Sequence, residues 1–168
     1  EKLKNHHGKN SALVLRPADC EETTVAWKLA LENTDTPTAL ILSRQNIKNL
    51  PAKESRYNEA LQAAKGAYIV TDSAGTPDVI LLASGSEVST LVEGAALLEK
   101  EGINVRIVSV PSEGLFRSQS KEYQQSVLPS GVKKFGLTAG LPVNLEGLVG
   151  ARCHGIAWTA RPGRCSRR

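Results

Sequence analysis

The sequence predicts an α/β protein, with a mostly parallel sheet that carries helices on both faces and a partial α/β domain before it. Short apolar runs rich in Val, Ile and Leu, typical of buried strands, alternate with stretches in which apolar residues recur every three or four positions, as on one side of a helix. Strands that alternate with helices are joined by right-handed crossovers, so neighbouring strands run parallel. A content of 40% apolar residues in a chain of 168 is enough for a hydrophobic core.

A strand–helix–strand unit comes first. The apolar run 12–15 predicts a short buried strand, which Pro17 stops. The segment Asp19–Glu22 reads D-x-x-E, the signature of a helix N-cap, and the helix is expected to continue over residues 23–33. The run 38–42 predicts a second buried strand.

The second part of the chain repeats this alternation. A short helix over residues 58–65 is expected to end at Gly66, because glycine adopts the left-handed conformation that commonly follows a helix. The segment Ser84–Ser86 is expected to form a tight turn between a strand and a helix. The remaining expected strands span residues 67–70, 79–83, 105–110 and 133–139, and the remaining expected helices span 87–100, 120–128 and 145–150.

The pattern divides the chain into four parts. Residues 1–46 supply only about two strands and one helix, too few to cover a sheet, so residues 1–57 are interpreted as the truncated end of a first domain. Residues 58–65 form a linker or short helix, residues 66–150 a second α/β domain, and residues 151–168 an anomalous Arg-rich tail. Because the sequence contains no Met, we expect it to be an internal piece of a longer protein.

The positive charge of the chain lies in its tail. Residues 1–150 hold 16 Lys and Arg against 17 Asp and Glu, a net charge of −1, whereas residues 151–168 hold five Arg and no acidic residue. The body therefore favours neither a nucleic-acid partner nor, without an apolar run of about 18 residues, a membrane. The tail leaves three interpretations open: a disordered basic tail, an RNA-binding or localisation arm, or a sequence artefact such as translation in a shifted frame.

The candidate binding residue is Arg44, which follows the expected strand 38–42 in the stretch Ser43–Asn46. In open parallel sheets, ligands bind beyond the carboxyl ends of the strands. A guanidinium at that place can hold a phosphate through two parallel hydrogen bonds, with hydroxyl and amide donors beside it. The residues alone leave open whether Arg44 binds an anion or is an ordinary solvated arginine.

Two weaker candidates have structural alternatives. The turn at Gly85–Glu87 could hold an anion at the start of a helix, but a strand-to-helix turn needs a glycine and a capping serine for its geometry alone. The pair His6–His7 could bind a metal, but it lacks a third ligand and suits a solvated loop. Spacing assigns no Ser-His-Asp, Cys-His or paired-carboxylate arrangement, so no catalytic residue is predicted.

Several segments, in this order and spacing, resemble the transketolase family. They are LRPADCEETTVAWKLALE, PTALILSRQN, KGAYIV, DVILLASGSEVS, VRIVSVPS, YQQSVLP and TAG. The most specific part is RPAD followed by AW and then SRQN, and the resemblance covers roughly residues 12–150.

The resemblance implies a three-domain cytoplasmic homodimer that depends on thiamine diphosphate and Mg²⁺ or Ca²⁺ and moves two-carbon ketol units between sugar phosphates in the pentose phosphate pathway. Residues 1–57 would be the end of the pyrimidine-binding domain and residues 66–150 the C-terminal domain. The Arg of SRQN binds the sugar phosphate in this family, so Arg44 is expected to have that role.

The family's motifs for the cofactor, the metal and the catalytic histidines are missing from this sequence. We therefore expect the chain alone to bind no cofactor or metal and to be inactive. The alternative is a stand-alone α/β module that binds an anion or a protein partner without catalysis.

Overall fold

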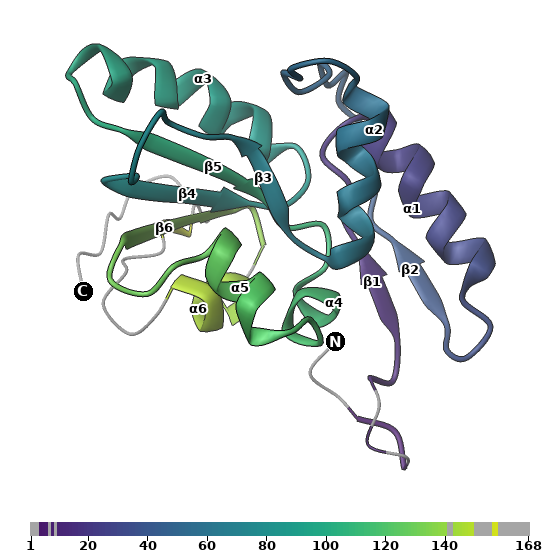
Figure 1. The fold of residues 1–168 in the computed structure, drawn as a ribbon. Helices are drawn as coiled ribbons and strands as arrows, with labels where there is room; N and C mark the ends of the chain where they lie inside the picture. Colours follow the sequence, from purple (N-terminus) through teal and green to yellow (C-terminus); the bar gives the residue numbers. More distant parts are fainter. Residues whose placement is uncertain (1–3, 7, 9, 141–142, 150–155, 158–168) are drawn as a thin grey trace.

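The computed structural model describes residues 4–6, 8, 10–140, 143–149 and 156–157, and it contains two sheets (Figure 1). Strands β1 (Leu13–Leu15) and β2 (Thr38–Leu40) form a parallel pair, connected by helix α1 (Cys20–Glu32). The second sheet has the strand order β3-β5-β4-β6-β7. In chain order its strands are β3 (Tyr68–Thr71), β4 (Val79–Ala83), β5 (Val105–Ser109), β6 (Lys133–Thr138) and β7 (Ile156–Ala157).

The second sheet is parallel except at one side. The pairs β4–β5, β4–β6 and β6–β7 are parallel, whereas β3 pairs antiparallel with β5 and shifts register between Ile69 and Thr71. The prediction of a mostly parallel sheet is confirmed.

Helices cover both faces of the second sheet, as predicted. Helix α3 (Glu87–Lys100) lies on one face, and the other face is covered by α4 (Glu113–Arg117), α5 (Lys121–Val127) and α6 (Val143–Val149) (Figure 1). Successive side chains of β4 alternate between the two cores, because side chains along a strand point to opposite faces. Leu81 and Ala83 pack with the core under α3, and Ile80 and Leu82 pack with the core under α4, α5 and α6.

The strand expected over residues 38–42 is shorter and more exposed than predicted. β2 ends at Leu40, and the next two side chains, Ile41 and Leu42, are 49% and 48% exposed. Within the described residues, the sheet that contains β2 has two strands, and α1 packs against it. The expectation of a buried strand is therefore wrong, because apolar composition does not reveal which faces of a sheet are covered.

The segment before β3 folds into two short helical pieces, α2 (Arg56–Ala60) and the 3₁₀ helix η1 (Leu61–Lys65). Gly66 ends them with φ +85°, which confirms the predicted stop. A Cβ atom at Gly66 would lie 2.2 Å from the backbone N of Phe116 in α4, so the position also requires the absence of a side chain. Helix α4 itself was not predicted, because five residues are too few to show a helical period.

The N-cap prediction at the start of α1 is also confirmed. The carboxylate of Asp19 accepts a hydrogen bond from the backbone N–H of Glu22 at 2.8 Å. Glu22 in turn accepts from the backbone N–H of Ala18 at 2.8 Å, and both acidic side chains are buried. The start of α1 is thus fixed by two carboxylates that reach the backbone on either side of it.

One hydrophobic core joins the first unit to the second sheet. It includes Val25 of α1, Ala60 of α2, Ala63 of η1 and Tyr68 of β3, together with the side chains beneath α3. The segment 58–65 therefore packs as part of the core rather than spanning a gap between two bodies.

Candidate anion site at the strand ends

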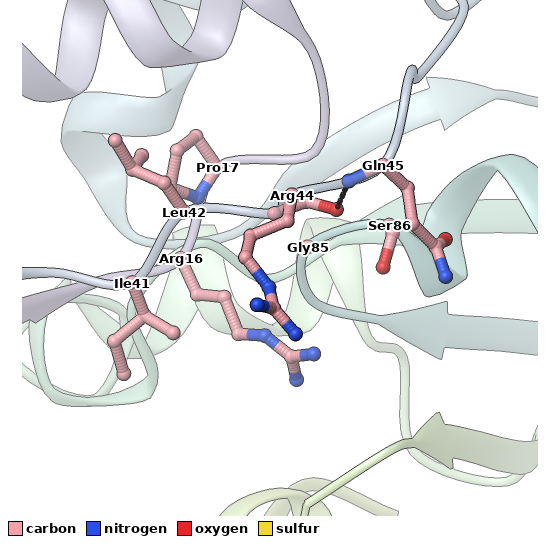
Figure 2. Close-up of a pocket in the computed structure, with 9 residues that line it drawn as sticks. Arg16, Pro17, Ile41, Leu42, Arg44, Gln45, Gly85 and Ser86 are labelled. Carbon is pink, nitrogen blue, oxygen red and sulfur yellow. Dashed lines mark hydrogen bonds between the residues drawn. The ribbon is translucent and has the colours of Figure 1, made fainter.

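A cleft of about 270 Å³ opens where the segment after β2 meets the turn between β4 and α3. Its lining residues come from the ends of three strands (Figure 2). They are Arg16, Pro17, Ile41, Leu42, Ser43, Arg44, Gln45, Gly85 and Ser86. Ligands of open α/β sheets bind at such carboxyl ends, so this is the place at which the fold favours a site.

Arg44 lies in this cleft, as its place in the sequence predicted. Its guanidinium extends into the open space in Figure 2 and makes no hydrogen bond or ion pair with any other residue that the structure describes. Ser43 shapes the turn before it, since its Oγ accepts a hydrogen bond from the backbone N–H of Gln45 at 3.0 Å. A guanidinium without a protein partner keeps all its N–H donors available for an anion.

Arg16 is a second cation in the cleft, and the sequence reasoning missed it. Its Nη2 lies 2.9 Å from Oε2 of Glu87, in the first turn of α3, and its Nη1 makes only a long contact of 3.5 Å with Ser84 Oγ. The signal was available: Arg16 follows the run 12–15 as Arg44 follows the run 38–42, so the strand-end rule applies to both.

The Glu87 carboxylate changes the interpretation of the turn at Gly85–Glu87. The side chain of Ser86 makes no capping hydrogen bond at the start of α3, and the acidic side chain of Glu87 already supplies negative charge there. A small anion held by this turn alone would meet that carboxylate. The turn therefore contributes to the cleft mainly by positioning the side chain of Arg16.

A buried ionic cluster lies outside the cleft and links α1, α2 and β3. Arg56 donates from Nε to Asp19 at 2.6 Å and from Nη2 to Glu22 at 3.2 Å and to the Tyr68 hydroxyl at 2.6 Å. The Tyr68 hydroxyl donates to Glu22 at 2.5 Å. The carboxylate of Asp19 also accepts from the backbone N–H of Leu50 at 2.9 Å.

Burial governs the protonation of this cluster. Desolvation raises the pKa of Glu22 above its ordinary value and outweighs the hydrogen bonds from Tyr68 and Ala18, which lower it. Desolvation also raises the pKa of Tyr68, and the neighbouring Glu22 charge adds to the shift. For Arg56, burial lowers the pKa, but the bonds to Asp19 and Tyr68 more than compensate, and the pKa is raised.

These carboxylates are engaged with protein groups, and the described part of the chain offers no metal site. No group of three or more His, Cys, Asp and Glu side chains there could hold a metal ion. His6 is exposed, whereas His7 and all of the tail except 156–157 lie outside the described residues. In the same described ranges, no helix is long and apolar enough to cross a bilayer.

The structure thus combines an α/β sheet with a cleft at its strand ends that is lined by two arginines, and comparisons with known proteins give the family. A family model described as the transketolase-like TK C-terminal domain matches residues 66–160. A transketolase from Staphylococcus aureus is 53% identical over 121 residues, which are 72% of this chain and 18% of that protein. The chain belongs to the transketolase family, and it spans about a fifth of the length of the curated relatives that it matches.

Two solved structures support the same assignment. A transketolase from Leishmania mexicana superposes with a TM-score of 0.74 at 38% identity and covers 86% of this chain and 20% of its own. A transketolase from Pichia stipitis, solved in complex with sedoheptulose-7-phosphate, superposes with a TM-score of 0.68 at 41% identity and covers 76% of this chain and 18% of its own. The predicted fold class is thereby confirmed.

Proposed function

We propose that this chain supplies the sugar-phosphate-binding arginine of a transketolase, an enzyme that moves two-carbon ketol units between sugar phosphates in the pentose phosphate pathway. The observation that carries the proposal is Arg44, whose guanidinium extends into the cleft with no partner among the described residues. The Pichia stipitis relative that was solved with a sugar phosphate supports the ligand class.

The role of Arg44 in that reaction is binding and orientation. A guanidinium that grips the phosphate at one end of a sugar limits where the carbonyl at the other end can lie. Charge-assisted hydrogen bonds of this kind contribute about 1.5–3 kcal/mol each. Loss of Arg44 should therefore weaken the binding of phosphorylated substrates more than it slows the chemical step.

The family relation also suggests properties of the whole enzyme. We propose that it is a cytoplasmic homodimer that uses thiamine diphosphate and Mg²⁺ or Ca²⁺, that residues 1–57 end its pyrimidine-binding domain, and that residues 66–150 form its C-terminal domain. The described residues do not fit that cofactor or its metal, because they hold no metal-ligand cluster and their buried carboxylates are already paired with arginines: Asp19 and Glu22 with Arg56, and Glu113 with Arg117. We therefore expect this chain alone to be inactive.

Calorimetric titration of the chain with ribose 5-phosphate tests the binding role. Arg44→Ala should weaken binding about tenfold or more, because a charge-assisted contact is lost. Lys100→Ala is the matched control, since it removes one positive charge from the exposed far end of α3. Unphosphorylated ribose should bind neither protein measurably; equal affinity of wild type and Arg44→Ala for ribose 5-phosphate would reject the role.

Activity measurements test the remaining claims. The chain with thiamine diphosphate and Mg²⁺ should not convert xylulose 5-phosphate plus ribose 5-phosphate, and turnover would show that it is a complete catalyst. In a whole transketolase that contains this sequence, Arg44→Ala should raise KM for phosphorylated substrates and spare hydroxypyruvate, which has no phosphate. Equal losses on both substrates would contradict phosphate binding by Arg44.

Exposed apolar side chains favour one alternative, a stand-alone interaction module. Four large apolar side chains of α1 and the segment after β2 are about half exposed or more: Trp27, Leu31, Ile41 and Leu42. A module that evolved to act alone should be monomeric and should unfold cooperatively. Light scattering and thermal melting decide between the two, because aggregation or a loose state favours a part of a larger enzyme.

A further inference from the structure

Two guanidinium groups, not one, face the cleft. Arg16 follows β1 and Arg44 follows β2, and these strands run parallel with Leu15 opposite Leu40. Both arginines line the same cleft, and both extend toward its open side in Figure 2. Two like charges in one small cleft repel each other unless an anion offsets them.

The two arginines differ in how far their charges are already offset. Arg44 has no partner among the described residues, whereas Arg16 is paired at one nitrogen with Glu87. The side chains of Arg16 and Glu87 are 23% and 15% exposed, so the pair is mostly shielded from water. Arg16 and Arg44 in the cleft and Glu87 beside it carry a net charge of +1 together. Among the described residues, only the long contact with Ser84 uses another nitrogen of Arg16.

The position of Arg16 is fixed by its backbone as well as by its side chain. Its N–H donates to the carbonyl oxygen of Pro111 at 2.8 Å, and its own carbonyl accepts from the N–H of Gly85 at 3.1 Å. Gly85 has φ +69°, and a Cβ atom there would lie 2.8 Å from Arg16 Nε, so the arginine stem lies directly against the turn. Arg16 is therefore held in place before any ligand arrives, unlike Arg44 in its exposed segment.

We propose that Arg16 is a second phosphate-binding residue of this cleft and that Glu87 limits its strength. A bound phosphate must share the Arg16 guanidinium with the Glu87 carboxylate, whose negative charge also repels the phosphate. The inference rests on the proposed function, because its ligand is the phosphate of that same site. A purely structural ion pair between Arg16 and Glu87 predicts a different result. Removal of either residue should then have the same effect on phosphate affinity.

Titration of the chain with ribose 5-phosphate separates the two roles by the direction of the change. Arg16→Gln removes a donor and a positive charge, so affinity should fall about tenfold. Glu87→Gln removes the competing negative charge and keeps a similar shape, so affinity should rise roughly threefold. Arg16→Lys keeps the charge and loses the planar fork, and its affinity should lie between those of wild type and Arg16→Gln.

Each outcome of the titration decides a separate point. If Glu87→Gln and Arg16→Gln both weaken binding, or if neither changes it, Arg16 is a structural residue and the inference is overturned. Circular dichroism checks that each variant folds; should Arg16→Gln not fold, Glu87→Gln and Arg16→Lys carry the decision. If Arg44→Ala leaves the affinity for ribose 5-phosphate unchanged, the proposed function fails. If Arg44→Ala weakens binding and Arg16→Gln does not, only the phosphate-binding role of Arg16 is rejected. Inorganic phosphate, titrated in parallel, should rank the variants in the same order but bind more weakly, because it lacks the sugar. A different order of the variants would contradict recognition of the phosphate itself.

Discussion

Replacing Tyr68 by phenylalanine should destabilise the fold by about 2–3 kcal/mol. The hydroxyl donates to the buried Glu22 carboxylate at 2.5 Å and accepts from Arg56 Nη2 at 2.6 Å. Hydrogen bonds to charged groups contribute about 1.5–3 kcal/mol each, and Tyr68→Phe removes two of them. The loss is partly offset because a buried hydroxyl no longer has to leave water on folding.

Urea unfolding measures this change in the free energy of unfolding, and two other tyrosines calibrate it. Tyr123 makes one hydroxyl bond, to the carbonyl oxygen of Ala67 at 2.9 Å, so Tyr123→Phe should cost about 1 kcal/mol. Tyr57 is 40% exposed, and its hydroxyl bonds to no other described residue, so Tyr57→Phe should cost less than about 0.5 kcal/mol. If Tyr68→Phe were no more destabilising than Tyr57→Phe, the cluster would not stabilise the fold and the reasoning would be refuted.

Three further changes have defined outcomes. Gly66→Ala should lower the free energy of unfolding in urea by about 2 kcal/mol or more, because it combines a positive φ with a backbone clash. Gly75→Ala, in open space, is the control and should change stability little. Equal effects of the two substitutions would contradict the clash. Burial raises the pKa of Glu22, so the protonated form of this side chain favours the folded state. As pH rises above 4.5, the wild type should therefore lose stability relative to Glu22→Gln. Parallel pH profiles of the two proteins in urea unfolding would contradict the shift. Gly85→Ala should displace the Arg16 side chain and weaken ribose 5-phosphate binding in the calorimeter, and unchanged affinity would show that the contact is dispensable.

Elements with a strong local signal could be predicted with accurate bounds. The strand 79–83 and the helix 87–100 appear where the sequence predicts them, because a continuous apolar run and a long helical period specify each. The five-residue helix α4 has no comparable period. The antiparallel direction of β3 depends on which strand it meets, and this is decided by tertiary packing rather than by its own residues.

The candidate site could be predicted only in part. Arg44 was identified from its place after a strand, and its location in a cleft agrees with that reasoning, while its role stays a prediction. Arg16 could have been found by the same rule. Its pairing with Glu87, 71 positions away, could not, because no periodicity relates residues that meet only when two sheets pack together. The same limit hides the contact between Arg56 and Asp19.

The exposed segment Ser43–Asn46 joins two parts of the chain that are already held together without it. A protease cut there would leave the main chain of Arg16 bonded to Gly85, and the carboxylate of Asp19 bonded to Arg56, across the break. The two pieces would behave as complementing fragments that stay associated after cleavage. The peptide bonds of this segment then serve mainly to give each piece a high effective concentration at the other.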